Sequence, residues 1–220
     1  MAVRGPPPAR RGDGHAFSLK EGTLAVKAAR RFVEAAVRGA SQAPSIKLPA
    51  RFKEPSGLFT TLSKFPEGDL RGCVGFAEPV MPLAEALKAA SVAAALEDGR
   101  FTPLTVEELP NIVVEVSLLT PPVRVDARSP EAVLRAVEVG RHGLIIRGGR
   151  QGGLLLPQVA VEWAWGAEEF LAHTCQKGGF APDFWKEEAA RVLTFEAEVF
   201  GEEQPRGEVR RREEPRPAGN

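Results

Sequence analysis

Tyrosine is absent from the 220-residue sequence, and cysteine occurs only twice, at Cys73 and Cys175. Two cysteines so far apart form no C-x-x-C motif, which excludes a zinc ribbon, a thioredoxin-type site and a disulfide-rich secreted domain. No apolar run approaches the roughly 18 residues that cross a bilayer, and the first residues lack the apolar stretch of a signal peptide. We therefore expect a cytoplasmic protein without membrane contact.

The sequence also has no net charge, because its 29 basic residues are balanced by 29 acidic residues. Proteins that grip long nucleic acids usually have a domain pI above about 9, whereas the pI here is about 6.9. Nucleic acid is therefore not an expected partner. The 43% of hydrophobic residues suffices for one domain with a substantial core.

The two ends of the chain differ in composition from its middle. Residues 1–14 are rich in Pro, Gly and Arg, and residues 201–220 are charged with almost no apolar side chain. Such segments bury too little surface to offset their ordering entropy. We expect disordered tails at 1–14 and 201–220 around one domain at 15–200.

Helix caps and hydrophobic spacing predict the main elements within this domain. Ser18 and Glu21 form a capping box for a first helix that ends near Gly39. Further helices are predicted to follow Pro82, Ser129, Pro157, Gly166 and Pro182, and strands are predicted at 57–63, 70–76, 111–119, 143–147, 152–156 and 193–200. Because βαβ alternation is absent, we expect an α+β fold with a mostly antiparallel sheet and flanking helices.

Polar residues interrupt two of these strands. Strand alternation places Arg71 and Cys73 on one face, and a cation beside a thiol favours the nucleophilic thiolate. The alternative is a small buried cysteine in a core strand. In the strand at 111–119, Glu115 and Ser117 share a face, and Glu115 is either paired with Arg71 or Arg100 or solvated on an edge strand.

Two helical segments carry further candidates. Gln158 and Glu162 are four residues apart after Pro157, so they either bind a polar ligand or form a surface pair. Cys175 and Lys177 end another helix, where a lysine either interacts with the helix C-terminus or holds an anion. The three histidines and two cysteines could ligate a metal only by long-range convergence, so no metal and no cofactor is expected.

These segments together resemble the AMMECR family. Residues 70–75 read LRGCVG where the family has LRGCIG. Further matches follow in family order over about residues 17–200: DGRFTPL at 98–104, VEVS at 114–117, HGL at 142–144, GLLLPQVA at 153–160, EEFL at 168–171 and CQKGG at 175–179, with Trp185. The resemblance implies one domain of two lobes with a groove between them, lined by these residues.

The resemblance also implies partners: in prokaryotes such domains are associated with Memo-like proteins and radical S-adenosylmethionine proteins in a shared modification pathway. One hypothesis is an enzyme or enzyme component acting on a small anionic ligand, with Cys73 as nucleophile and Glu115 or His142 as acid or base. Its substrate-binding residues would be Arg71, Arg100, Ser117, Gln158, Glu162, Cys175 and Lys177. The alternative is a non-catalytic scaffold that uses the same groove, with Arg71 paired to Glu115 or Glu162.

Overall fold

The computed structural model describes residues 17–40, 44–127 and 129–212. The helices are α1 (Leu19–Val37), α2 (Leu83–Leu96), α3 (Pro130–Ala136), α4 (Pro157–Glu162) and α5 (Ala167–Lys177), with short 3₁₀ turns at Ala50–Lys53, Leu109–Asn111 and Phe184–Lys186. The strands are β1 (Leu58–Lys64), β2 (Leu70–Phe76), β3 (Ile112–Leu119), β4 (Val123–Arg124), β5 (His142–Gly148), β6 (Gln151–Leu155), β7 (Arg191–Glu202) and β8 (Val209–Arg212). Among these residues, no helix is both long enough and apolar enough to cross a membrane.

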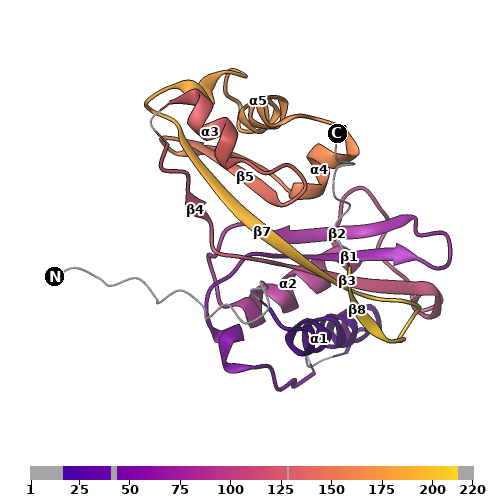
Figure 1. The fold of residues 1–220 in the computed structure, drawn as a ribbon. Coiled ribbons are helices and arrows are strands. Elements are labelled where there is room, and N and C mark those ends of the chain that lie inside the picture. Colours follow the sequence, from indigo (N-terminus) through magenta and orange to yellow (C-terminus); the bar gives the residue numbers. More distant parts are fainter. Residues whose placement is uncertain (1–16, 41–43, 128, 213–220) are drawn as a thin grey trace.

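One antiparallel sheet runs through the molecule in the order β2-β1-β3-β7-β5-β6, with β4 and β8 also pairing with β7. The long strand β7 joins two lobes, as the diagonal yellow arrow of Figure 1 shows. Its first half pairs with β4 and β5, and its second half pairs with β8. The predicted α+β class with a mostly antiparallel sheet is confirmed.

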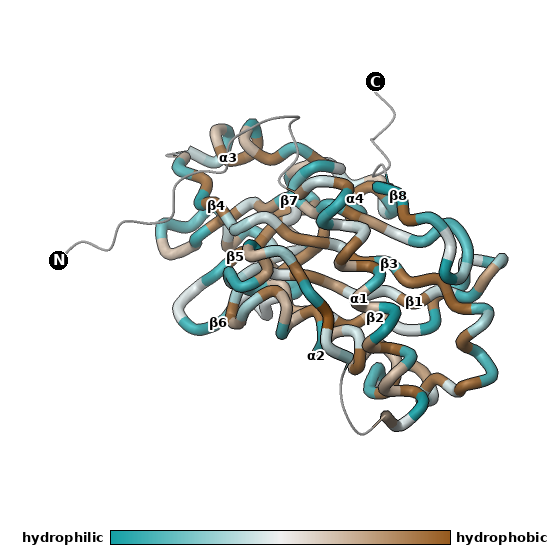
Figure 2. Tube along the Cα trace, turned by 90° about the horizontal axis from the view of Figure 1, so that it is seen from below, coloured by the Kyte–Doolittle hydropathy of each residue, from teal (hydrophilic) through white to brown (hydrophobic). Residues whose placement is uncertain are grey.

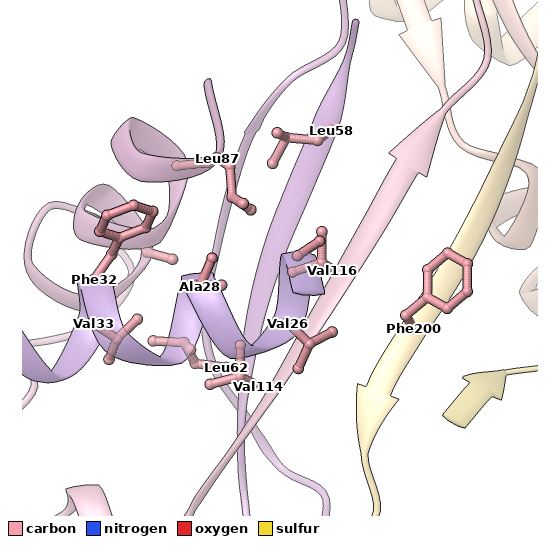
Figure 3. Packing of buried hydrophobic residues seen from close by; sticks show 14 of the residues in the cluster. Val26, Ala28, Phe32, Val33, Leu58, Leu62, Leu87, Val114, Val116 and Phe200 are labelled. Carbon is pink, nitrogen blue, oxygen red and sulfur yellow. The ribbon is translucent and has the colours of Figure 1, made fainter. Parts of the chain in front are cut away.

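The N-terminal lobe packs α1 and α2 on one face of β1, β2 and β3. Val26 and Val33 of α1 point towards Leu62 and Val114 of the sheet (Figure 3). Hydrophobic residues recur along β3 and α2, and hydrophilic residues gather at the outer loops (Figure 2). Burial of this side of the strands leaves their alternate residues on an open face directed away from the two helices.

The C-terminal lobe has its own core, in which α4 and α5 cover β5 and β6. Phe170, Leu171 and Cys175 of α5 pack with Leu144 and Ile146 of β5. A third, smaller cluster joins the lobes, where Leu119 of β3 contacts Ile145 of β5 and Phe195 of β7. The ion pair from Arg147 to Glu78 also links the lobes at 2.8 Å.

Local signals placed most helix starts correctly. The capping box of Ser18 and Glu21 is present at α1, and Ser129 caps α3 by accepting a hydrogen bond from Ala132. Gly140 is the residue of the sequence that could end the helix after Ser129, but α3 ends at Ala136 instead, because Val137 is extended. The capping residue therefore fixed where this helix begins but not its length.

The prediction of a disordered tail at 201–220 is wrong for residues 201–212, which complete β7 and form β8. Two ion pairs with buried carboxylates tie this segment to the lobe: Glu202 accepts hydrogen bonds from Arg30, and Glu198 accepts one from Arg211. Ion pairs with buried carboxylates supply order that apolar content alone does not. Residues 1–14 and 213–220 lie outside the described residues.

Candidate functional site

The LRGCVG segment forms the edge strand β2, which is irregular at Arg71. Leu62 pairs with Gly72 and Ser63 pairs with Leu70, so a bulge leaves Arg71 without a partner on β1. A bulge shifts the alternation of side chains. The prediction that Arg71 and Cys73 lie side by side is therefore wrong, since it assumed a regular strand.

Arg71 instead holds the segment that follows α2. Its guanidinium donates two hydrogen bonds to Glu108, at 2.8 and 3.1 Å, and its side chain is only 7% exposed. The guanidinium also lowers the pKa of Glu108 below its ordinary value. Arg71 is thus engaged in a bidentate structural pair, and its partner is neither Glu115 nor Glu162.

Gly72 brings β2 against α2. A Cβ atom added at Gly72 would lie 2.1 Å from the carbonyl oxygen of Ala94, so only glycine fits between the strand and the helix. This close contact fixes the distance between β2 and α2. It thereby fixes the position of Cys73, the next residue of β2.

Cys73 is partly exposed on the open face of the sheet. The hydroxyl of Thr61, its neighbour on β1, donates a hydrogen bond to the Cys73 sulfur at 3.4 Å. The backbone N–H of Cys73 donates to the Asp98 carboxylate at 2.8 Å, and Arg100 donates to the Cys73 carbonyl at 3.1 Å. The backbone and the thiol of Cys73 are thus both held in place.

Asp98 and Arg100 form an ion pair beside the thiol. The hydrogen bond from Arg100 lowers the pKa of Asp98 far below its ordinary value. The hydrogen bond with Asp98 raises the pKa of Arg100, and the Cys73 side chain adds to this effect. Because the Arg100 side chain is 56% exposed, the guanidinium that lies beside Cys73 is accessible to a ligand.

The acidic strand β3 places Glu115 in the same row as Cys73. Cys73 pairs with Thr61 on β1, and Thr61 pairs with Glu115 on β3, so the Cα atoms of Cys73 and Glu115 lie two strands, or about 10 Å, apart. The closest ion-pair partner of Glu115 is Arg212 of β8 at 3.9 Å, not Arg71 or Arg100 as predicted. Burial raises the pKa of Glu115 against the opposing effect of Arg212.

Ser117 is the next residue of β3 on this face and is buried. It pairs with Phe59 of β1, whose ring lies against Gly75 of β2. Cys73, Thr61, Glu115 and Ser117 therefore share one face of the sheet of the N-terminal lobe, which is open at the first three residues and covered at Ser117.

The remaining predicted site residues belong to the C-terminal lobe. Gln158, the second residue of α4, has its Oε1 atom buried and without a hydrogen-bond donor among the described residues, whereas Glu162 is exposed at the end of that helix. Cys175 is 0% exposed in the core, where burial raises its pKa, and Lys177 is exposed. The two cysteines therefore lie in separate lobes.

His142 also lies apart from Cys73. It pairs with Glu196 in the half of β7 that belongs to the C-terminal lobe, and its Nδ1 accepts a hydrogen bond from the Glu138 backbone at 3.1 Å. Burial lowers the pKa of His142, which favours a neutral ring. This geometry gives His142 a local structural role at the turn before β5.

Sequence reasoning missed three residues of the site. Asp98 stands in the quoted DGRFTPL segment, so its proximity to Arg100 was visible, but its hydrogen bond to Cys73 was not. Thr61 belongs to no motif in the sequence that would mark it as a site residue. Arg212 lies in the segment 201–220, which was expected to be a disordered tail. Among the described residues, no group of three or more His, Cys, Asp and Glu is arranged to hold a metal ion.

The fold and the open polar face define an α+β protein of two lobes that share one strand. A family model described as AMMECR1 matches residues 26–200, and the chain belongs to this family. Protein MJ0810 of Methanocaldococcus jannaschii is 48% identical over 193 residues, covering 88% of this chain and 96% of that protein. Protein PH0010 of Pyrococcus horikoshii is 45% identical over 202 residues, covering 89% and 98%.

The fold is also similar to a solved structure. The crystal structure of the uncharacterised protein PH0010 matches with a TM-score of 0.77 at 45% identity, covering 88% of this chain and 97% of that one. The family suggested by the LRGCVG segment is thus confirmed.

Proposed function

We propose that the chain is an enzyme, or the substrate-handling component of one, that acts on a small substrate with an anionic group through Cys73. In this proposal Cys73 is the nucleophile or covalent carrier, Arg100 binds the anionic group, and Glu115 is the acid or base. The observation that carries it is the partly exposed thiol that accepts a hydrogen bond from Thr61 beside an accessible guanidinium.

The physical argument concerns the position of the sulfur. The Thr61 hydroxyl holds the partly exposed sulfur in place, and the exposed Arg100 guanidinium lies where it can bind an anionic group next to that sulfur. Asp98 is already engaged by Arg100 and by the Cys73 backbone. Glu115 suits proton transfer because a carboxyl with a raised pKa exchanges protons closer to neutral pH.

The other predicted participants have reduced parts in this proposal. Arg71 positions Cys73 indirectly through the fold, while His142 and Cys175 are left out of the chemistry. Memo-like and radical S-adenosylmethionine proteins remain the proposed partners, supported by the family resemblance alone.

Site-resolved alkylation with iodoacetamide tests the nucleophile. In the native chain we expect Cys73 to react faster than the same residue in the urea-unfolded chain, because the folded site holds the partly exposed sulfur in one orientation through the Thr61 hydroxyl. Cys175 is the internal control: at 0% exposure it should react only after unfolding. Mass spectrometry of the two cysteine-containing peptides measures both rates in one sample.

Variants of the thiol's neighbours extend the test. Thr61→Val removes the hydroxyl at nearly constant volume, so it should slow Cys73 alkylation while leaving Cys175 protected. Arg100→Gln should slow it as well. A native Cys73 that reacts no faster than in the unfolded chain would exclude the nucleophile role.

A non-catalytic scaffold is the second candidate, and the structural use of Arg71 and Gly72 favours it. Half of the LRGCVG segment serves packing: Arg71 pairs with Glu108, and Gly72 contacts α2. Under this alternative Cys73 is only a small residue, so Cys73→Ser would preserve any biological activity of the chain. Under the enzyme proposal the same substitution abolishes it.

A further inference from the structure

A cavity of about 260 Å³ opens at the hairpin end of the open sheet face. It is walled by the β1–β2 hairpin with Phe65, by Val113 and Glu115 of β3, and by Arg212 of β8. It lies beside Ser63, two residues along β1 from Thr61, and so extends the row that contains Cys73.

Two opposite charges at the floor of this cavity are only loosely paired. The Oε2 atom of Glu115 lies 3.9 Å from Nε of Arg212, beyond hydrogen-bond distance. The Arg212 guanidinium donates one hydrogen bond, from Nη2 to the Glu202 carbonyl, and Glu115 accepts none from the described residues. Both groups therefore retain unfilled hydrogen-bonding capacity.

Gly201 keeps the space between the two charges open. A Cβ atom at this position would lie 3.1 Å from Nε of Arg212 and 3.3 Å from Oε2 of Glu115. Any larger residue would crowd both polar groups. The absence of a side chain at Gly201 therefore leaves room beside the carboxylate and the guanidinium.

The charges around the cavity select against ions of a single sign. Lys64 and Arg212 would repel a cation, and Glu115 and Glu203 would repel an anion. The third carboxylate of the lining, Glu202, is already paired with Arg30. A ligand carrying one charge would also leave the opposite group unpaired, which costs binding free energy. A ligand carrying both charges satisfies both groups.

We propose that this cavity binds a small zwitterion of the α-amino acid class, with its ammonium group on Glu115 and its carboxylate on Arg212. One carbon atom separates the two charged groups of an α-amino acid, which suits receptor charges 3.9 Å apart. Phe65 and Val113 supply an apolar wall, so the preferred side chain is aliphatic. The inference goes beyond the proposed function: the carboxylate of this zwitterion binds Arg212 rather than Arg100, and its ammonium group binds Glu115, which lies two strands from Cys73.

Isothermal titration calorimetry with L-leucine tests the site in the full chain. Two analogues each lack one charge: 4-methylpentanoate has no ammonium group, and leucinamide has no carboxylate. We expect leucine to bind and each analogue to bind at least about tenfold more weakly, since each loses a charge-assisted hydrogen bond.

Variants locate the binding. Glu115→Gln and Arg212→Gln should each weaken leucine binding about tenfold or more, with unfolding midpoints recorded to show that both variants fold. Arg210→Gln is the matched control, because Arg210 lies on the same strand but pairs with Glu203 and Glu208 instead of Glu115. It should bind leucine like the unaltered chain.

The proposal is overturned by any of three results: no binding at about 10 mM leucine, an analogue that binds as tightly as leucine, or an Arg212→Gln variant with unchanged affinity. Repeating the titration with Cys73→Ser separates this proposal from the preceding one. Leucine binding with an unreactive Cys73 would refute only the nucleophile, and a reactive Cys73 without leucine binding would refute only the zwitterion site.

Discussion

Gly72→Ala is the most direct test of how the LRGCVG segment is positioned. The added methyl group would lie 2.1 Å from the carbonyl oxygen of Ala94, whereas unstrained carbon–oxygen contacts are about 3.3 Å or longer. Both sides of this contact are backbone, and β2 is held by its pairing with β1. The overlap of about 1.2 Å can be relieved only by moving α2 away from the sheet.

Such a movement weakens a close-packed layer. Ala90 and Ala94 of α2 are buried against the sheet, and a gap of about 0.5–1 Å forfeits a quarter to a half of each dispersion contact. Overpacking therefore costs about 3 kcal/mol, at the upper end of the usual range. Alanine restricts the unfolded chain more than glycine does, which raises the free energy of unfolding by up to about 1 kcal/mol. The net loss in the free energy of unfolding is therefore roughly 2 kcal/mol or more.

Urea unfolding followed by far-ultraviolet circular dichroism measures this loss, because the signal reports α1 and α2. A thermal scan should show a midpoint lowered by at least roughly 4–8 °C. Gly99→Ala is the control, since a Cβ atom there meets nothing within 4 Å; it should change stability by no more than about 0.5 kcal/mol. If Gly72→Ala lost less than about 1 kcal/mol at an unchanged slope, the packing argument would be refuted.

Arg71→Ala should lower the free energy of unfolding by about 2 kcal/mol in urea titrations, less than the loss of a fully buried pair, because Glu108 is 32% exposed and regains water. Arg71→Lys should recover only part of this, and equal stability of the two variants would contradict a bidentate pair. Glu115→Gln should become more stable relative to the unaltered chain as the pH rises above about 4.5, with no difference at lower pH, because burial raises the pKa of Glu115 and so penalises its charged form in the folded state. The unfolding midpoints of both proteins, measured below and above this pH, test the prediction. A stability difference that does not change with pH would refute it.

The candidate site was only partly predictable from the sequence. Alternation along 111–119 correctly put Glu115 and Ser117 on one face. The family resemblance pointed to Cys73 and Arg100, and Arg100 donates a hydrogen bond to the Cys73 carbonyl. Which arginine lies beside the thiol depends on a bulge, because one unpaired residue reverses the alternation beyond it. Gln158, Cys175 and Lys177 belong to α4 and α5 of the other lobe, where Cys175 is buried in the core. Their convergence with Cys73 on a groove between the lobes stays a prediction.

Local patterns by themselves determined the helices, most strands and the α+β class, since caps and hydrophobic spacing act within a few residues. The tertiary structure alone decided that β7 joins two lobes and that a charged terminal segment becomes a paired strand. It also decided that Arg212 faces Glu115 across Gly201. These outcomes depend on contacts between residues far apart in the chain, such as Arg30 with Glu202, whose pairing no local pattern specifies.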